Sequence, residues 1–170
     1  MARRSRPGNG TQQVSPVGRS DGFTYIGILL AVIFLGIALS AVGTVWSTVA
    51  QRDREAELLF VGSAYRDAIR SYYIHSPGGA RFPMALDELV EDHRFPVVQR
   101  HLRRLYADPT TGRADWELIQ NESGAIIGVR SSSHKTPIKR ANFTYADRTF
   151  KDADCYCDWQ FVYAPTRGRP

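Results

Sequence analysis

Recognisable catalytic and nucleotide-binding motifs are missing from this chain of 170 residues. It has no Walker loop, no dinucleotide-binding glycine fingerprint and no G-x-S-x-G turn that would expose a nucleophilic serine. Its four histidines follow no recurring spacing. These absences predict a protein that is not an enzyme, with no small-molecule substrate and no resident cofactor. A catalytic triad assembled in space would leave no such pattern, so an enzyme stays an alternative.

A dense basic surface is missing as well. The net charge of +5 comes largely from residues 1–22, which hold four arginines and one aspartate. In the rest of the chain no basic stripe is interleaved with aromatic residues, the pattern typical of single-strand binding. Nucleic acid is therefore not an expected partner.

Charged residues are absent from one long apolar run, Phe23 to Gln51, which holds 29 residues. About 20 residues are enough for a helix to cross a bilayer. Inside a bilayer the run must be helical, because its backbone groups find no water there. It is too long for the apolar core of a cleaved secretory signal, which needs about 7–15 residues. The run therefore predicts a single membrane span over residues 23–51, with membrane lipid as its first surroundings.

The two flanks of this run predict its orientation. Residues 1–22 carry the arginine excess, whereas the flank from Arg52 to Glu57 has no such excess, with two arginines and three acidic residues. An excess of Lys and Arg marks the cytoplasmic side of a span. We therefore expect the N-terminus in the cytoplasm and everything after the span outside. Residues 1–22 are also rich in Pro, Gly and Ser, a composition that buries no core and predicts a disordered leader.

The helical pattern continues beyond the apolar run. Residues 51–73 contain no proline, and an apolar stripe runs along them at spacings of four and three residues. The stripe consists of Leu58, Gly62, Tyr65, Ile69 and Tyr72. Charged residues of this stretch, Glu55 among them, are expected on the other faces of the helix. We predict one continuous helix from Phe23 to about Ile74, ended by the Ser-Pro-Gly-Gly stretch that follows.

Residues 76–170 are expected to form a small α+β head that packs on residues 52–75, the outer half of the long helix. The patterns predict short helices over 82–90 and 97–105, a turn over 106–112, and strands over 116–120, 125–129 and 156–163. Residues 142–145 are expected to form a further short strand or a loop. The head would then contain three to four antiparallel strands.

The start of the apolar run carries a resemblance to a known family. The junction Gly22-Phe23-Thr24-Tyr25-Ile26, placed after a basic leader, resembles the class III signal of type IV pilins and of the pseudopilins of type II secretion systems. The resemblance implies that a prepilin peptidase cuts between Gly22 and Phe23 and methylates Phe23. It also implies a single-pass inner-membrane protein with a periplasmic head. Such a protein joins other pilin-like subunits on an inner-membrane assembly platform, and its assembled form lies in the periplasm.

Gly27 departs from the family pattern, which usually has a glutamate near this place in the apolar run. In the family that glutamate is thought to neutralise the free amine of a neighbouring subunit. A buried carboxylate is costly unless it is paired, so its absence removes both the cost and the pairing. Gly27 therefore favours a minor subunit over a major fibre subunit, and a divergent branch of the family is the other interpretation.

Two other functions fit the same features. The chain would be a single-span, signal-anchored binding module with a small periplasmic head, or a membrane-tethered periplasmic enzyme. Loss of residues 1–22 together with N-terminal methylation is expected for the pilin-like subunit alone.

The only cysteines, Cys155 and Cys157, allow two interpretations. An even count in an oxidising compartment favours a disulfide. Residues two apart in an extended strand have Cα atoms about 6.5–7 Å apart, at the edge of the bridging range, so the bond requires a tight turn. Metal binding by the pair together with His134 is the alternative, although the chain lacks a four-ligand spacing.

Three carboxylates lie in the same C-terminal segment. Major pseudopilins often carry a calcium-binding loop near the C-terminus, and by that resemblance Asp152, Asp154 and Asp158 are calcium candidates. The alternative is a solvated acidic turn.

Overall fold

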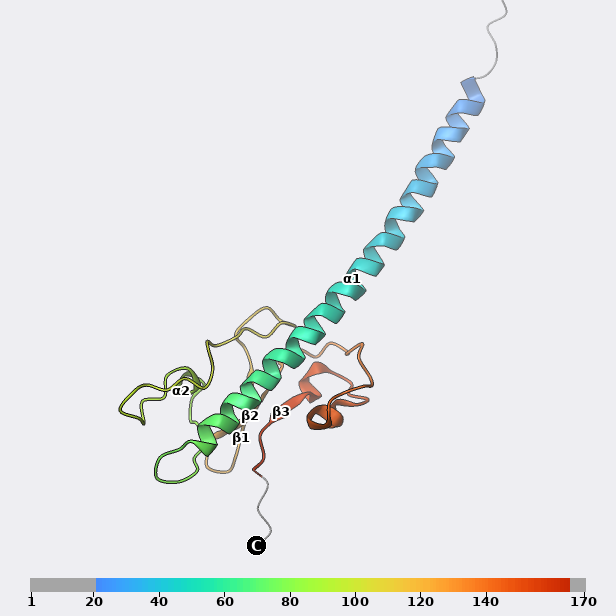
Figure 1. Cartoon of the computed structure of the whole chain (residues 1–170). Coiled ribbons are helices and arrows are strands. Elements are labelled where there is room, and N and C mark those ends of the chain that lie inside the picture. Colours follow the sequence, from blue (N-terminus) through green and yellow to red (C-terminus); the bar gives the residue numbers. More distant parts are fainter. Residues whose placement is uncertain (1–20, 166–170) are drawn as a thin grey trace, which may run out of the picture. The chain divides into compact units, whose positions relative to one another are not determined.

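The computed structural model describes residues 21–165, apart from the side chains of residues 21, 22 and 38–45. The chain divides between Thr44 and Val45 into two compact units. Over the described residues the elements are α1 (Asp21–Ile74), α2 (Asp87–Val90), β1 (Glu117–Gln120), β2 (Ile126–Arg130), β3 (Gln160–Val162) and the 3-10 helices η1 (Tyr145–Phe150) and η2 (Tyr156–Asp158) (Figure 1). The predicted leader lies outside the described residues, except for the backbone of its last two residues.

The long helix ends where the sequence predicts. α1 is a single helix of 54 residues that begins two residues before Phe23 and ends at Ile74. The following Pro77 cannot continue a helix, and Gly78 and Gly79 both adopt positive φ.

The three described strands form one antiparallel sheet in the order β1-β2-β3, so the fold class is α+β as predicted. β1 and β2 form a hairpin whose turn is closed by a hydrogen bond from the Gly124 N–H to the Asn121 carbonyl. Gly124 has a φ of 78° there, which favours glycine. β3 returns from the end of the chain to pair with β2, with Gly128 opposite Val162.

The core of the head forms between the second half of α1 and the sheet. The apolar stripe predicted on α1 is buried, with Leu58, Tyr65 and Ile69 at 0% exposure. Sheet residues Ile126, Val129 and Phe161 belong to the same buried cluster, and Figure 1 shows the strands beside this part of the helix. Gly62, also on the stripe, lets α1 approach the ring of Phe161, because a Cβ there would overlap that ring.

Two local predictions in the head are wrong. Residues 97–105 form no helix; instead Asp92 and Gln99 form an isolated antiparallel bridge, and the N–H groups of His101 and Leu102 donate to the Leu89 carbonyl. The helix predicted over 82–90 is confined to its last turn, α2. In both places backbone groups pair outside the predicted helix, since the Pro83 carbonyl accepts a hydrogen bond from the Ile126 N–H at 2.8 Å. A local apolar spacing does not reveal such pairing. Residues 142–144 take no regular structure, and η1 begins at the next residue.

Candidate functional site

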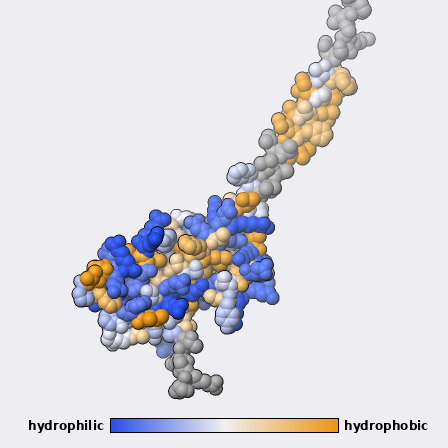
Figure 2. All heavy atoms as spheres, in the orientation of Figure 1, coloured by the Kyte–Doolittle hydropathy of each residue, from blue (hydrophilic) through white to orange (hydrophobic). Residues whose placement is uncertain are grey.

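The N-terminal part of α1 presents large apolar side chains in every direction. Between residues 23 and 37 the exposed fraction of these side chains runs from 45% at Leu29 to 86% at Phe23. Consecutive helical residues are about 100° apart around the axis, so the exposed runs 28–30 and 32–35 point to all sides. Figure 2 shows the described part of this segment mostly in hydrophobic colours. A helix that is apolar all round normally lies in an apolar environment.

The predicted span covers residues 23–51, and the structure describes the side chains of this range except those of residues 38–45. Taking the helical residues whose side chains the structure describes, no stretch is both long enough and apolar enough to cross a membrane.

The predicted processing site lies in the first turn of α1, since the helix begins at Asp21 and the Gly22–Phe23 bond follows directly. Farther along, a Cβ built at Gly27 or Gly36 would meet nothing within 4 Å. Contacts with the side chains that the structure describes therefore do not require glycine at these two positions.

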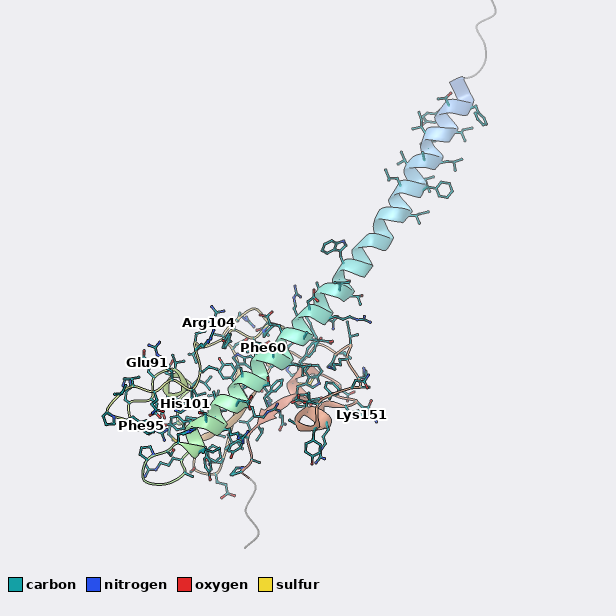
Figure 3. All side chains as sticks on the ribbon, in the orientation of Figure 1. Phe60, Glu91, Phe95, His101, Arg104 and Lys151 are labelled. Atoms are coloured by element: carbon teal, nitrogen blue, oxygen red, sulfur yellow. A yellow bond between two sulfur atoms is a disulfide. The ribbon has the colours of Figure 1, made fainter. Side chains whose placement is uncertain are left out.

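A buried polar cluster joins the end of α1 to the segment after α2. Asp92 is 1% exposed and binds Arg94 through both oxygens, with Nε–Oδ1 and Nη2–Oδ2 distances of 2.8 and 2.6 Å. The His101 ring lies between Asp92 (Nε2–Oδ2 3.2 Å) and Ser71 of α1 (Nδ1–Oγ 2.8 Å), and Figure 3 shows His101 beside this end of the helix. The hydrogen bonds from Arg94, opposed by burial, hold the pKa of Asp92 well below its usual range.

The order Ser71–His101–Asp92 is that of a catalytic triad, but its surroundings indicate a structural role. The His101 side chain is 3% exposed, which leaves no room for a substrate between it and Ser71. Arg94 also stacks on the Tyr72 ring at 3.5 Å and donates to the Tyr72 carbonyl at 3.2 Å. These contacts fasten the segment after α2 to the last turns of α1.

A second buried charge, Glu55, holds the loop that precedes η1. Glu55 is 3% exposed and accepts hydrogen bonds from the Tyr156 hydroxyl at 2.8 Å and from the N–H groups of Ile138 and Lys139 at 2.5 and 3.3 Å. Gln51 donates to the same hydroxyl at 2.9 Å. Burial and the bond to Glu55 raise the pKa of Tyr156 to about 12.

The expectation that Glu55 lies on a face of the helix other than the apolar stripe is wrong. The sequence does contain a signal for its burial. Gln51 and Glu55 extend the apolar stripe backward from Leu58 at the same spacings of four and three. A polar residue on such a stripe faces the head, and it is tolerated there when hydrogen bonds satisfy it.

The two cysteines and His134 are brought together near the C-terminus. Cys155 and Cys157 form a disulfide with a Cα–Cα distance of 5.1 Å, shortened from the extended value by the tight turn of η2. The Nδ1 atom of His134 lies 3.6 Å from the Cys157 sulfur. One ligand atom from each of the three residues lies within 4.8 Å of the others. The disulfide and the alternative metal site therefore involve the same residues: the disulfide belongs to the oxidised state, and metal binding would require the reduced state.

The carboxylates proposed for calcium do not gather in the same way. Among the described residues, the only group of three metal-ligating side chains within such distances is that of His134 and the two cysteines. Asp158 instead accepts the N–H groups of Asp154 and Cys155, both at 3.2 Å, and caps η2. Asp152 is exposed. Calcium binding stays a prediction.

Comparisons of the chain with protein-family models, with curated proteins and with solved structures found no match. A functional proposal therefore depends on the chain's own residues, chiefly the junction at Gly22 and the apolar segment that follows it.

Proposed function

We propose that the chain is a pilin-like subunit of a type II secretion or pilus-related machine, anchored in the inner membrane by the first half of α1. The observation that carries the proposal is the apolar segment that begins at Phe23, whose large side chains are exposed on all sides in the described part. Leaving them in water would be unfavourable by about 25 cal/mol per Å² of apolar surface. Lipid before assembly, and neighbouring helices after it, remove that exposure.

Processing and assembly follow from the position of the junction. A prepilin peptidase cuts after Gly22 at the cytoplasmic face and methylates Phe23, which leaves a mature chain that starts with its apolar helix. Assembly exchanges lipid for neighbouring helices, an exchange without new hydrophobic gain, so close packing has to drive it. Gly27 and Gly36 suit this role, because a Cβ at either position would meet no described atom within 4 Å.

The head is the part of the subunit that would lie in the periplasm. Its core includes the second half of α1. Because Gly27 stands where the family usually has a glutamate, this subunit has no carboxylate there to neutralise the N-terminal amine of a neighbouring subunit. This favours a minor subunit.

The first prediction concerns processing. Co-expression of the full chain with a prepilin peptidase is expected to remove residues 1–22 and to add one methyl group, as measured by the intact mass of the membrane-extracted protein. Gly22→Ala is expected to leave the full-length precursor in the membrane. Gly36→Ala is the matched control, because it makes the same change in the same helix at an open position, and it should be processed like wild type.

A wild-type chain that keeps its first 22 residues in the presence of an active peptidase would contradict the proposal. The single-span binding module would then be the better interpretation, provided the chain still fractionates with membranes.

A further inference from the structure

The positions of His134, Cys155 and Cys157 are set by the backbone. The N–H of Tyr156 donates to the Lys135 carbonyl at 3.1 Å, and the N–H of Cys157 donates to the Ser133 carbonyl at 3.2 Å. These two bonds fix the segment around His134 alongside η2. The three donors therefore meet through pairing of distant segments, and they would stay neighbours if the bond between the sulfurs were opened.

We propose that Cys155, Cys157 and His134 form a redox-gated site for one thiophilic cation of the zinc or copper(I) type. In the oxidised chain the disulfide occupies both sulfurs and the site is closed. In the reduced chain two thiolates and one imidazole supply three ligands, and water or a small thiol takes the fourth position. The proposal goes beyond the assembly function and depends on neither the membrane nor a fibre.

One ligand-to-ligand distance, measured in the oxidised chain, suits such an ion. Zinc binds thiolate sulfur at about 2.3 Å and imidazole nitrogen at about 2.0–2.1 Å, so at a tetrahedral angle these two ligand atoms lie about 3.5 Å apart. The observed distance from His134 Nδ1 to the Cys157 sulfur is 3.6 Å. Thiolate ligands select soft and borderline metals over calcium or magnesium.

The chemistry of opening the site balances with a dithiol as reductant. The dithiol gives two electrons and two protons to the disulfide, breaks the S–S bond and leaves as its own disulfide. Metal binding then displaces the two thiol protons, because thiolate is the ligand form. His134 is exposed and both cysteines are half-buried, so reductant and metal can reach the site.

Stabilising the head is a poor explanation for this disulfide. A disulfide stabilises mainly by closing a loop in the unfolded chain, and the effect grows with the length of that loop. Cys155 and Cys157 are two residues apart, so their loop is among the shortest that a disulfide closes. The fold places an exposed histidine beside this bond, an arrangement that stabilisation alone does not need.

The test uses the full chain in detergent, once oxidised and once reduced with a dithiol that is then removed under argon. Titration with zinc alone against a chromophoric chelator is expected to show one tightly bound zinc per reduced chain and none per oxidised chain. Bound zinc should also slow alkylation of the two thiols in the wild-type chain, a measurement that needs no variant. Equal zinc binding in both redox states, or no binding in the reduced state, would overturn the proposal.

Variants separate the ligands from other metal-binding groups. His134→Ala is expected to weaken zinc binding by at least roughly tenfold, since loss of even a supporting group beside a metal has that effect. His93→Ala is the matched control, because His93 is an exposed histidine bonded to neither cysteine. If His134→Ala binds zinc as tightly as wild type, or if the control is weakened equally, His134 is not a ligand and the proposed site is wrong.

Discussion

The carboxylate of Asp92 is the most deeply placed charge at the end of α1, and its pairing gives a prediction with a defined pH dependence. Asp92→Asn is expected to lower the free energy of unfolding by about 3 kcal/mol at pH 7, since it breaks a buried ion pair with Arg94. The folded-state pKa of Asp92 lies below its ordinary value of 3.8. The contribution is therefore complete above pH 4 and is lost as the pH falls toward the folded pKa.

Urea unfolding of both chains at pH 7, 5 and 3 measures this difference, which should be similar at pH 7 and 5 and smaller at pH 3. Asp67→Asn is the control, because Asp67 is an exposed aspartate on α1, the helix to which the Asp92 cluster is bonded. An equal difference at pH 7 and pH 3 would mean that the ion pair is not what Asp92 contributes.

The hydroxyl of Tyr156 gives a prediction with the opposite pH dependence: its contribution to stability is lost as the pH rises. Tyr156→Phe is expected to lower the free energy of unfolding by about 1–2 kcal/mol at pH 8, because Glu55 loses one hydrogen-bond donor. The pKa of Tyr156 is raised from 10.0 to about 12 in the folded head. Its contribution is complete below pH 10 and is lost between pH 10 and 12. Denaturant unfolding at pH 8 and pH 11 checks both statements, with Tyr145→Phe, at a tyrosine 82% exposed, as the control.

At the scale of elements, the head depends on the close approach of α1 to β3 at Gly62. Gly62→Ala is expected to lower the free energy of unfolding by about 1–3 kcal/mol, because the added methyl group overlaps the ring of Phe161. A double-mutant cycle with Phe161→Leu isolates the contact: the cost of the alanine should fall when the ring is replaced. If Gly62→Ala costs the same with Phe161 and with Leu at position 161, the destabilisation does not come from contact with the ring.

Elements that depend on local signals could be predicted, and those that depend on distant pairing could not. α1 was predicted to its last residue because its apolar spacing and its Pro-Gly stop are both local. Residues 97–105 were predicted as a helix from the spacing of Leu102 and Leu105, but their backbone pairs with Leu89 and Asp92. The cysteine pair was likewise visible in the sequence, whereas the approach of His134 depends on pairing across more than 20 residues.

At the scale of the whole molecule, the two units place different demands on their surroundings. Every residue of the buried core cluster lies between Leu58 and Phe161, within the second unit. The first unit has large apolar side chains that are exposed wherever the structure describes them. We therefore expect the first unit to require an apolar environment and the second unit to fold without one.

This division predicts the behaviour of a shortened chain, Val45–Pro170. It is expected to stay monomeric in buffer without detergent and to unfold cooperatively in urea, because truncation removes none of the described side chains of the buried core cluster. Near-ultraviolet circular dichroism follows the packing of Trp116 and Trp159, both at 9% exposure or less. Leu58→Ala in the same chain should lower the free energy of unfolding by about 2–5 kcal/mol, because Leu58 is fully buried. A shortened chain that lacks this dichroism signal or needs detergent would show that the head takes part of its stability from the apolar segment.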